Sequence, residues 1–241
     1  MLIAINCDMG ESFGLYRMGD DAAIMPFVTV ANVACGFHAS DPVVMQRTVR
    51  LAKQHGVKVG AHPSLPDLQG FGRREMKMGS EELTACILYQ VGALKGFLDA
   101  EGMALNHIKP HGALYGMSAR SAKVAAAIAV AAKVFGVPVF GMAGTEHERV
   151  YGQAGLDFVA EFYADLDYDE AGALIITREH AAVEPAAAAA RVRRAIEEGK
   201  VRSTKGNDIA VTARSVCVHS DTPGAVEVAK AVKLALARHL A

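Results

Sequence analysis

The chain has no excess of positive charge and no basic run. Its 25 Lys and Arg residues are balanced by 26 Asp and Glu residues, so the net charge is −1. Neither this charge nor any RNA-binding motif favours a nucleic-acid partner, because such binding depends on neutralising phosphates. No uninterrupted apolar run approaches the ~18 residues of a membrane span. The N-terminus enters a strand-like run with no basic segment before it, so we expect neither a signal peptide nor a membrane partner.

Cysteines are few, and their spacing does not indicate a disulfide framework or a zinc ribbon. None of the four, Cys7, Cys35, Cys86 and Cys217, belongs to a CxxC motif, and three of them lie in apolar strand-like runs. We therefore expect buried free thiols. This usage is typical of a protein of the reducing cytoplasm.

Several short catalytic motifs are also missing. The sequence contains no GxxxxGK[ST], so any nucleotide that the protein uses is not bound by a P-loop of this chain. The GFGRRE segment at 70–75 lacks the third glycine of a dinucleotide fingerprint. Neither HxH nor HExxH occurs, so no metal site is signalled by local spacing. No serine or cysteine nucleophile motif stands out.

What the chain does have is an alternation of strand-like and helix-like segments, with 51% hydrophobic residues. We expect strands at 2–8, 27–34, 57–61, 106–115, 137–141, 158–163 and 209–218, and a short extra strand or hairpin at 171–176. We expect helices at 41–55, 80–101, 119–135, 145–153, 185–198 and from 222 to the C-terminus. About seven repeats predict a single α/β domain over residues 1–241, a parallel β/α barrel of irregular TIM-like form. A doubly wound open sheet is the alternative.

Ionisable residues stand where these predicted strands end. The group consists of Asp8, His38, His62, His111, Asp165 and His219. Ligands bind at the carboxyl ends of the strands in both architectures, so we expect these side chains to face one mouth. One isolated histidine is more often structural, whereas four at corresponding positions indicate a shared site. The remaining histidines do not fall at predicted strand ends: His55, His107, His147, His180 and His239.

Several roles are open for the residues of this mouth. The catalytic candidates are Asp8, His38, His62, Lys109, His111 and His219, as metal ligands, acids, bases or hydrogen-bond donors. The substrate-binding candidates are Asn6, Glu11, Arg73, Arg74, Tyr115, Asp165 and Asp221. A cation here suits an oxyanion or an anionic substrate group. The alternatives are a solvated surface charge for Glu11, Lys109 and the arginines, and helix capping for Asp41 and Asp221. The pattern favours hydrolysis, or a related reaction, of a small polar substrate.

Six segments together resemble the LamB/YcsF family, whose members are the A subunits of 5-oxoprolinase. They are INCDMGESFG, NVACGFHASDP, GAHPSLPDLQGFGRR, HIKPHGALY, EFYAD and CVHSDTPGA, and they span residues 5–225. Several of these motifs are long and unusual, and together they cover nearly the whole chain.

The resemblance implies a β/α barrel related to polysaccharide deacetylases. It also implies ATP-dependent ring opening of 5-oxo-L-proline to L-glutamate, carried out with the B and C subunits as partners. A lactam is a poor electrophile, and phosphorylation of its carbonyl oxygen makes the carbon open to attack by water. ATP is then the expected cofactor, with its site shared with the partners. The histidines and carboxylates would position and deprotonate the water, and Lys109 with an arginine would hold an anionic group.

The sequence departs from the family pattern at Leu166, where the family usually has an arginine. This removes a cation at a strand end and leaves another lactam or amide open as the substrate. A stand-alone metal-dependent deacetylase, with Asp8, His38 and His62 as ligands of a divalent metal, is the first alternative. A non-catalytic regulatory protein of the same complex is the second. The sequence leaves open whether the chain forms a homo-oligomer.

Overall fold

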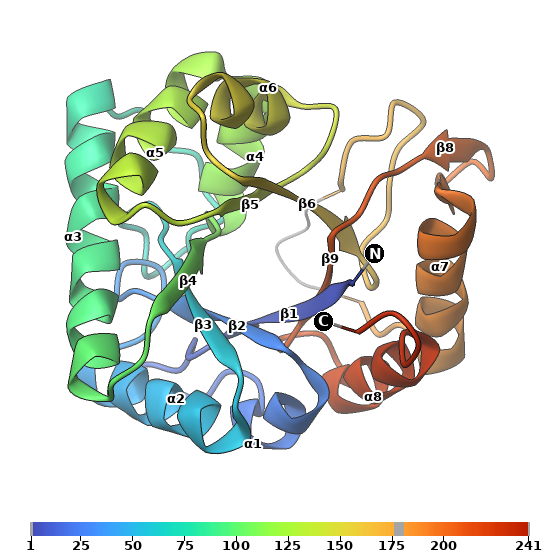
Figure 1. Ribbon diagram of the computed structural model, residues 1–241, viewed down its shortest axis with the longest axis horizontal. Coiled ribbons are helices and arrows are strands. Elements are labelled where there is room, and N and C mark those ends of the chain that lie inside the picture. The colour runs from blue at the N-terminus through green and yellow to red at the C-terminus, as the bar shows by residue number, and fades with distance from the viewer. Residues whose placement is uncertain (1, 176–180, 241) are drawn as a thin grey trace.

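The computed structural model describes residues 2–175 and 181–240, and its centre is a closed barrel of parallel strands (Figure 1). The strands are β1 (Ala4–Met9), β2 (Val30–Ala34), β3 (Lys58–His62), β4 (Leu105–Ile108), β5 (Val139–Gly141), β6 (Phe158–Tyr163) and β9 (Ser215–His219). They pair in chain order, and β9 closes the barrel by pairing with both β6 and β1. The predicted parallel β/α barrel is confirmed.

Helices form the outer layer around these strands (Figure 1). They are α1 (Asp21–Ile24), the 3-10 helix η1 (Met25–Phe27), α2 (Pro42–His55), α3 (Ser80–Ala100), α4 (Gly112–Arg120), α5 (Ala122–Phe135), α6 (Glu146–Gln153), α7 (Pro185–Glu198) and α8 (Ala225–Ala235). A separate antiparallel hairpin, β7 (Lys200–Arg202) and β8 (Asp208–Ala210), lies beside α7. None of the described helices is long and apolar enough to cross a membrane.

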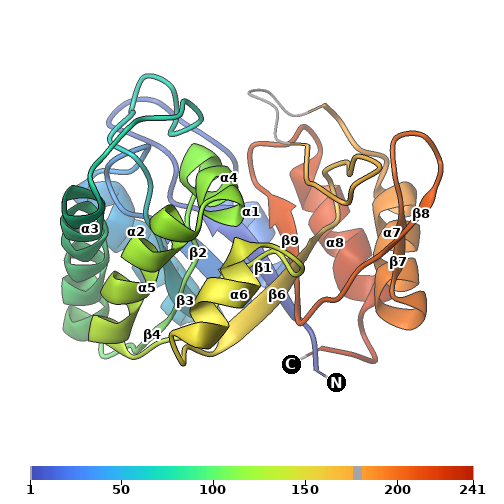
Figure 2. The same ribbon diagram turned by 90° about the horizontal axis from the view of Figure 1, so that it is seen from above.

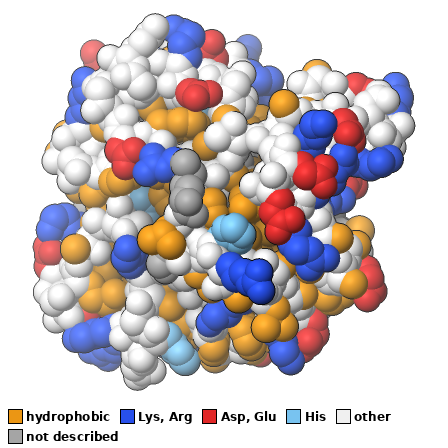
Figure 3. Space-filling view, turned by 45° about the vertical axis from the view of Figure 1, so that its right-hand side comes forward, with side chains coloured by type: hydrophobic (Ala, Val, Ile, Leu, Met, Phe, Trp, Pro, Cys, Tyr) orange, Lys and Arg blue, Asp and Glu red, His pale blue; other side chains and the backbone are white. Residues whose placement is uncertain are grey.

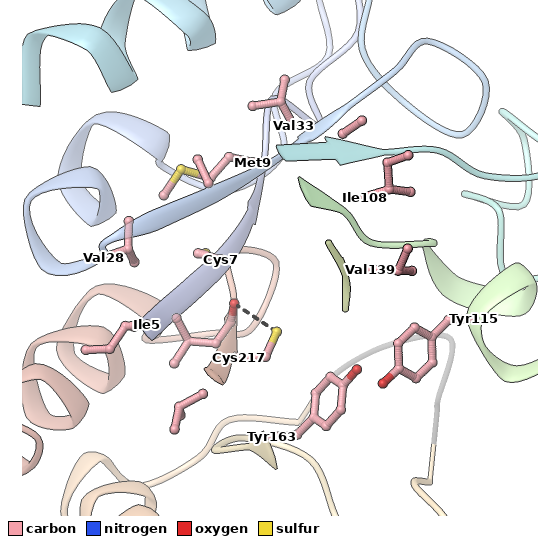
Figure 4. Packing of buried hydrophobic residues seen from close by; sticks show 14 of the residues in the cluster. Ile5, Cys7, Met9, Val28, Val33, Ile108, Tyr115, Val139, Tyr163 and Cys217 are labelled. Atoms are coloured by element: carbon pink, nitrogen blue, oxygen red, sulfur yellow. Dashed lines mark hydrogen bonds between the residues drawn. The ribbon is translucent and has the colours of Figure 1, made fainter. Parts of the chain in front are cut away.

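The alternation of side chains along each strand separates an apolar outer surface from a polar interior. On β1, Ile5 and Met9 are fully buried and point toward the surrounding helices (Figure 4). Asn6 and Asp8, on the other face of the same strand, are also buried. Burial of each such apolar side chain contributes about 1.5–3 kcal/mol. The stability of the barrel therefore comes from its outer apolar belt, and this leaves the interior available for polar groups.

The loops that follow β1 and β3 extend from the side of the barrel opposite to the two termini (Figure 2). They leave the carboxyl ends of their strands, as all βα loops do in a parallel barrel. The segment between β3 and α3 is the long predicted loop at 64–79. This end of the barrel is consequently the covered end, where the strand-end residues lie.

Four predicted elements were wrong in their bounds or type. The first turn of the expected strand 27–34 belongs to η1, where Pro26 favours a helical turn over a strand. The expected strand 209–218 is two strands, β8 and β9, with no glycine or proline between them to mark the break. The expected strand 106–115 ends at Ile108, and its second half begins α4. The last helix begins at Ala225, after a turn at 222–224.

The proposed extra strand at 171–176 falls partly outside the described residues. Within them, Tyr168 and Leu174 form an isolated antiparallel bridge rather than a strand. Asp41 caps α2, because its side chain accepts hydrogen bonds from the backbone N–H groups of Val43 and Val44. All four cysteines are buried free thiols, as the sequence predicted.

Candidate active site

Asp8, the last inward-facing residue of β1, is the centre of a buried group of charged side chains. Its Oδ1 accepts a hydrogen bond from Lys109 Nζ at 2.9 Å. Its Oδ2 lies 3.2 Å from His62 Nε2 and 3.8 Å from His219 Nε2. These residues stand at the carboxyl ends of different strands, and each is at most 8% exposed. The parallel topology therefore brings four predicted site residues into contact.

Lys109 leaves the end of β4 and reaches into the barrel. Its Nζ donates to Asn6 Oδ1 at 3.2 Å and lies 3.0 Å from the sulfur of Cys217. Burial opposes the charge of Lys109, but Asp8, Cys217 and Glu161 outweigh it and hold its pKa well above the ordinary value. Burial is likewise outweighed at Asp8, whose pKa His62 and Lys109 hold well below its usual range. The two form a fixed ammonium–carboxylate pair.

His219, at the end of β9, is paired with Asp165, which follows β6. Its Nδ1 lies 2.9 Å from Asp165 Oδ1, and its backbone N–H donates to Asp165 Oδ2 at 2.8 Å. Burial disfavours an imidazolium, but Asp165 and Cys217 outweigh it and hold the pKa of His219 well above its ordinary value. His219 is therefore protonated at neutral pH, and its Nε2 is the nitrogen nearer to Asp8.

A second group of side chains surrounds His62. His38 Nε2 lies 3.0 Å from Glu11 Oε1, and His111 Nδ1 lies 3.0 Å from His62 Nε2 and 3.4 Å from Glu11 Oε1. Burial, reinforced by the neighbouring histidines, holds the pKa values of His38 and His111 well below the ordinary value. Burial, together with Asp8 and Asp221, raises the pKa of Glu11 well above its usual range. The imidazoles of His38 and His111 are therefore neutral at pH 7.

The loop between β3 and α3 closes over this second group. Gly72 has φ +64°, and a Cβ there would meet Ser64 Oγ at 2.3 Å and His38 Cβ at 2.8 Å. Only glycine fits at such a position, because it tolerates both the left-handed backbone and the close approach. The preceding residue, Phe71, presents its carbonyl oxygen to His111 Nε2 at 2.8 Å. The GFG segment thus acts as a backbone support for His111, not as a phosphate-binding loop.

The two adjacent arginines of this loop have different positions. Arg73 lines the mouth and binds Asp221 at 2.7 Å, and both side chains are 9% exposed. Arg74 binds Asp67 of its own loop, and its side chain is 64% exposed. The structure brings Arg73 to the site and does not bring Arg74. Asp221 is not a helix cap, because the residue before the first turn of α8 is Gly224.

The cavity at this mouth is small. It measures about 40 Å³, which is room for two or three water molecules. Its lining includes Asp8, His62, Arg73, Lys109, His111, Tyr115, Tyr163, Leu166, Leu174 and His219. Tyr115, on α4, and Tyr163, at the end of β6, turn their hydroxyl groups toward each other (Figure 4). Leu166 and Leu174 give the mouth an apolar wall.

Sequence reasoning missed the polar floor beneath the mouth. Asn32 donates to both Asp8 Oδ1 and Asn6 Oδ1 at 2.7 Å, and its own oxygen lies 2.8 Å from His107 Nε2. Glu161 accepts a hydrogen bond from Asn6 at 3.0 Å. His107 does not end a strand, so the strand-end pattern does not include it. It precedes Lys109 by two residues, and this period-two spacing is the signal that places both inside the barrel.

The surface outside the mouth carries charge of both signs. Figure 3 shows acidic and basic side chains interspersed over the face that it presents. Many of them are paired, as Arg194 is with Asp208 and Arg191 is with Asp167. The ionisable groups of the mouth are instead buried, and burial with specific partners is what marks a candidate active site.

The fold and this mouth define a β/α-barrel protein with a buried His/Asp/Lys site at the carboxyl ends of its strands. The family model of the LamB/YcsF family matches residues 3–240. The chain belongs to the LamB/YcsF family.

Relatives with printed functions cover almost the full length. "Lactam utilization protein lamB" of Emericella nidulans is 49% identical over 95% of this chain and 92% of its own. The 5-oxoprolinase A-chain protein of Thermus thermophilus is 47% identical over 98% of this chain and 96% of its own. The crystal structure of the lactam utilization protein from the same species superposes with a TM-score of 0.92 at 46% identity, covering 99% and 97%. A GH113 β-1,4-mannanase shares the fold alone, with a TM-score of 0.52 at 11% identity, covering 98% of this chain and 99% of its own.

Proposed function

We propose that this chain is the A subunit of an ATP-dependent 5-oxoprolinase, which hydrolyses 5-oxo-L-proline to L-glutamate. The observation that carries the proposal is the buried pairing of Asp8 with Lys109 and of Asp165 with His219 at one mouth. Full-length relatives at about 47% identity, named as one subunit of 5-oxoprolinase, support a role in 5-oxoproline or lactam utilisation. The word "subunit" in their names supports partner chains, which we identify as the B and C subunits.

The chemistry of a lactam explains why ATP is needed. Amide resonance makes the ring carbonyl a poor electrophile, and phosphorylation of its oxygen withdraws electrons from the carbon. Water then forms a bond to that carbon and gives up a proton to a base. The ring C–N bond breaks and the nitrogen takes a proton. Hydrolysis of the remaining acyl phosphate yields the new carboxylate and inorganic phosphate.

Each step has a suitable group at the mouth. His219 is protonated at neutral pH and provides an acid for the departing ring nitrogen. Lys109 provides a fixed positive charge near the oxygen that becomes negative. Glu11 and the neutral His111 are the candidates to accept the proton of the attacking water. Asp8 holds Lys109 and orients His62.

The mouth also has features for binding a small cyclic acid. Arg73 lines the mouth and could pair with the substrate carboxylate, in exchange for Asp221. Leu166 and Leu174 would contact the ring methylenes. Leu166 thus replaces a cation by an apolar wall that a lactam ring can use. A cavity of about 40 Å³ holds no nucleotide, and this supports an ATP site shared with partner subunits.

Reconstitution tests this proposal. The chain is co-purified with candidate B and C subunits, and ATP hydrolysis is measured with and without 5-oxoproline. We expect lactam-dependent ATP hydrolysis that yields glutamate, and we expect His219→Gln to abolish it. Arg74→Ala is the matched control, because Arg74 lies in the loop outside the mouth. Full activity of His219→Gln, or hydrolysis of the lactam without ATP, would contradict the proposal.

A second candidate function is a stand-alone metal-dependent amide hydrolase. The cluster of Glu11, His38, His62 and His111, whose ligand atoms all lie within 4.8 Å of one another, favours this interpretation. Amide hydrolysis by the isolated chain, without ATP or partners, is the outcome that would replace the first candidate by the second.

A further inference from the structure

Two ring nitrogens at the mouth face each other in a way that a hydrogen bond between neutral rings does not explain. His62 Nε2 and His111 Nδ1 lie 3.0 Å apart. The other nitrogen of each ring lies against a backbone carbonyl oxygen, of Lys109 at 2.7 Å and of Phe71 at 2.8 Å. A carbonyl oxygen only accepts, so these outer nitrogens carry the hydrogens. In neutral imidazoles the two inner nitrogens then present lone pairs to each other.

Such an arrangement is the one that metal-binding histidines have. A ligating histidine almost always donates its second N–H to a carbonyl or carboxylate, which fixes the tautomer and aims the free nitrogen at the ion. Both His62 and His111 have this second partner. Their rings are perpendicular, at 89°. One ion can therefore lie in the planes of both rings at once.

Glu11 completes the group and His38 does not belong to it. Glu11 Oε1 lies 3.4 Å from His111 Nδ1, on the side of the lone pair. His38 is stacked on His111, with 6° between the planes and 3.8 Å between the centroids. An ion in the plane of His111 therefore lies above the face of His38, where imidazole has no lone pair. His38 Nε2 donates instead to Glu11 Oε1 at 3.0 Å, so His38 orients the carboxylate.

The distances fit a tetrahedral ion. Ligands about 2.0–2.2 Å from zinc at tetrahedral angles are separated by roughly 3.3–3.5 Å. The observed separations of 3.0 and 3.4 Å are close to this value. We propose that His62 Nε2, His111 Nδ1 and Glu11 Oε1 bind one divalent cation of the zinc type, with His38 as a positioning residue. Two histidines and a glutamate, with a fourth position open, form a ligand set of catalytic zinc sites.

The other cluster that could hold a metal, Asp8, Cys217 and His219, already contains a cation. Lys109 Nζ lies 2.9 Å from Asp8 Oδ1 and 3.0 Å from Cys217 Sγ. The ammonium group therefore takes the place of an ion there. The proposed set also differs from Asp8, His38 and His62, the ligands suggested by the sequence. Asp8 lies 3.2 Å from His62 Nε2, on the edge of the new site.

A proton is the competing occupant of this site. One proton on His62 Nε2 could be shared between Asp8 and His111, but it would leave Glu11 without a share in the positive charge. A divalent ion would satisfy all three ligands and could polarise a carbonyl or activate a water at its open position. The proposal goes beyond the lactam reaction and does not depend on it, because ion binding is a property of the isolated chain.

Metal analysis of the purified chain tests the site. After chelation and dialysis, Zn²⁺ is added and binding is followed by calorimetry and by the increase in Tm. We expect one ion per chain. We expect His62→Ala and His111→Ala each to remove tight binding. His38→Ala, which leaves the ligands in place, should keep one ion per chain but weaken its affinity about 10- to 100-fold.

Controls separate loss of ligand from loss of fold. His219→Gln keeps its metal if the site is the proposed one, and loses it if the ion is held by the Asp8–Cys217–His219 cluster. Co²⁺ substituted for Zn²⁺ gives a second readout, since a cysteine ligand adds an intense thiolate-to-metal absorption that the proposed N₂O set lacks. No stoichiometric Zn²⁺ binding, tight binding by His111→Ala, or a thiolate band in the Co²⁺ spectrum would each overturn the proposal.

Discussion

The mouth of the barrel contains two groups of histidines whose protonation differs. His219 lies against Asp165, and its pKa is held well above the ordinary value despite burial. His111 is equally buried but lies against a backbone carbonyl and two other rings, and its pKa is held well below. Burial opposes the charge in both, so the partner decides the outcome. A carboxylate partner makes an acid, and a carbonyl partner makes a neutral ring with a free lone pair.

This difference assigns separate tasks to the two halves of the site. The half formed by Asp8, Lys109, Asp165 and His219, here the charged half, suits proton donation and stabilisation of negative charge. The half formed by Glu11, His38, His62 and His111, here the imidazole half, suits acceptance of a proton or binding of an ion. Asp8 joins the two halves, because its Oδ1 contacts Lys109 and its Oδ2 contacts His62.

Removing the cation of the charged half should have the largest effect. Lys109→Met leaves Asp8 and Glu161 buried without their counter-charge, so we expect a destabilisation of about 3–5 kcal/mol, measured by denaturant unfolding. We also expect loss of activity in the reconstituted complex. The double variant Asp8→Asn/Lys109→Met should recover part of the stability. Equal stability of Lys109→Met and the parent chain would show that the pair is not a buried ion pair.

Neutralising the partner of His219 should convert its behaviour toward that of the imidazole half. Asp165→Asn removes the main cause that raises the pKa of His219. His219 acts in its protonated form, so activity is lost as pH rises through its pKa. Lowering that pKa moves the alkaline limb of kcat/KM to lower pH, and we expect kcat at neutral pH to fall about 10²- to 10⁴-fold. An unmoved alkaline limb would remove His219 as the acid.

The adjacent arginines offer a matched pair of variants. Arg73 lies at the mouth and Arg74 lies outside it. We expect Arg73→Ala to raise KM for the lactam about 10- to 100-fold, since a charge-assisted hydrogen bond to a carboxylate contributes about 1.5–3 kcal/mol. Arg74→Ala should leave KM unchanged. Equal effects of the two would mean that Arg73 has no special contact with the substrate.

The smallest effect tests the same rule away from the mouth. His147 on α6 is buried, its Nδ1 accepts the backbone N–H of Met142 at 3.1 Å, and burial lowers its pKa to about 4. The unfolded chain therefore takes up a proton below about pH 6.5 that the folded chain does not. Its stabilising contribution is present above about pH 6.5 and falls by about 1 kcal/mol between pH 6.5 and 5.5.

His147→Gln should reduce this pH dependence in denaturant unfolding measurements. His55→Gln, at the exposed end of α2, serves as the control and should leave it unchanged. If both variants keep the full slope, His147 is not the group responsible.

The convergence of the strand-end residues could be predicted from the sequence, because a parallel barrel puts the end of every strand at one mouth. Asp8, His62 and His219 required only the topology. The floor was missed because Asn32 and Glu161 lie within apolar runs, where one polar residue gives little signal. Arg73 and Arg74 could not be distinguished, because their positions depend on the turn made by Phe71 and Gly72, both with positive φ. The separation into two halves depends on partners far away in the chain, such as Asp165 for His219.

The comparison of the two histidines is tested most directly by nitrogen NMR of the ¹⁵N-histidine-labelled chain at pH 7, with His219→Gln and His111→Gln used to assign the signals. We predict that both ring nitrogens of His219 are protonated. We predict that His111 is neutral, with its hydrogen on Nε2 and its lone pair on Nδ1. A neutral His219, or a His111 protonated on both nitrogens, would contradict the division of the mouth into a charged and an imidazole half.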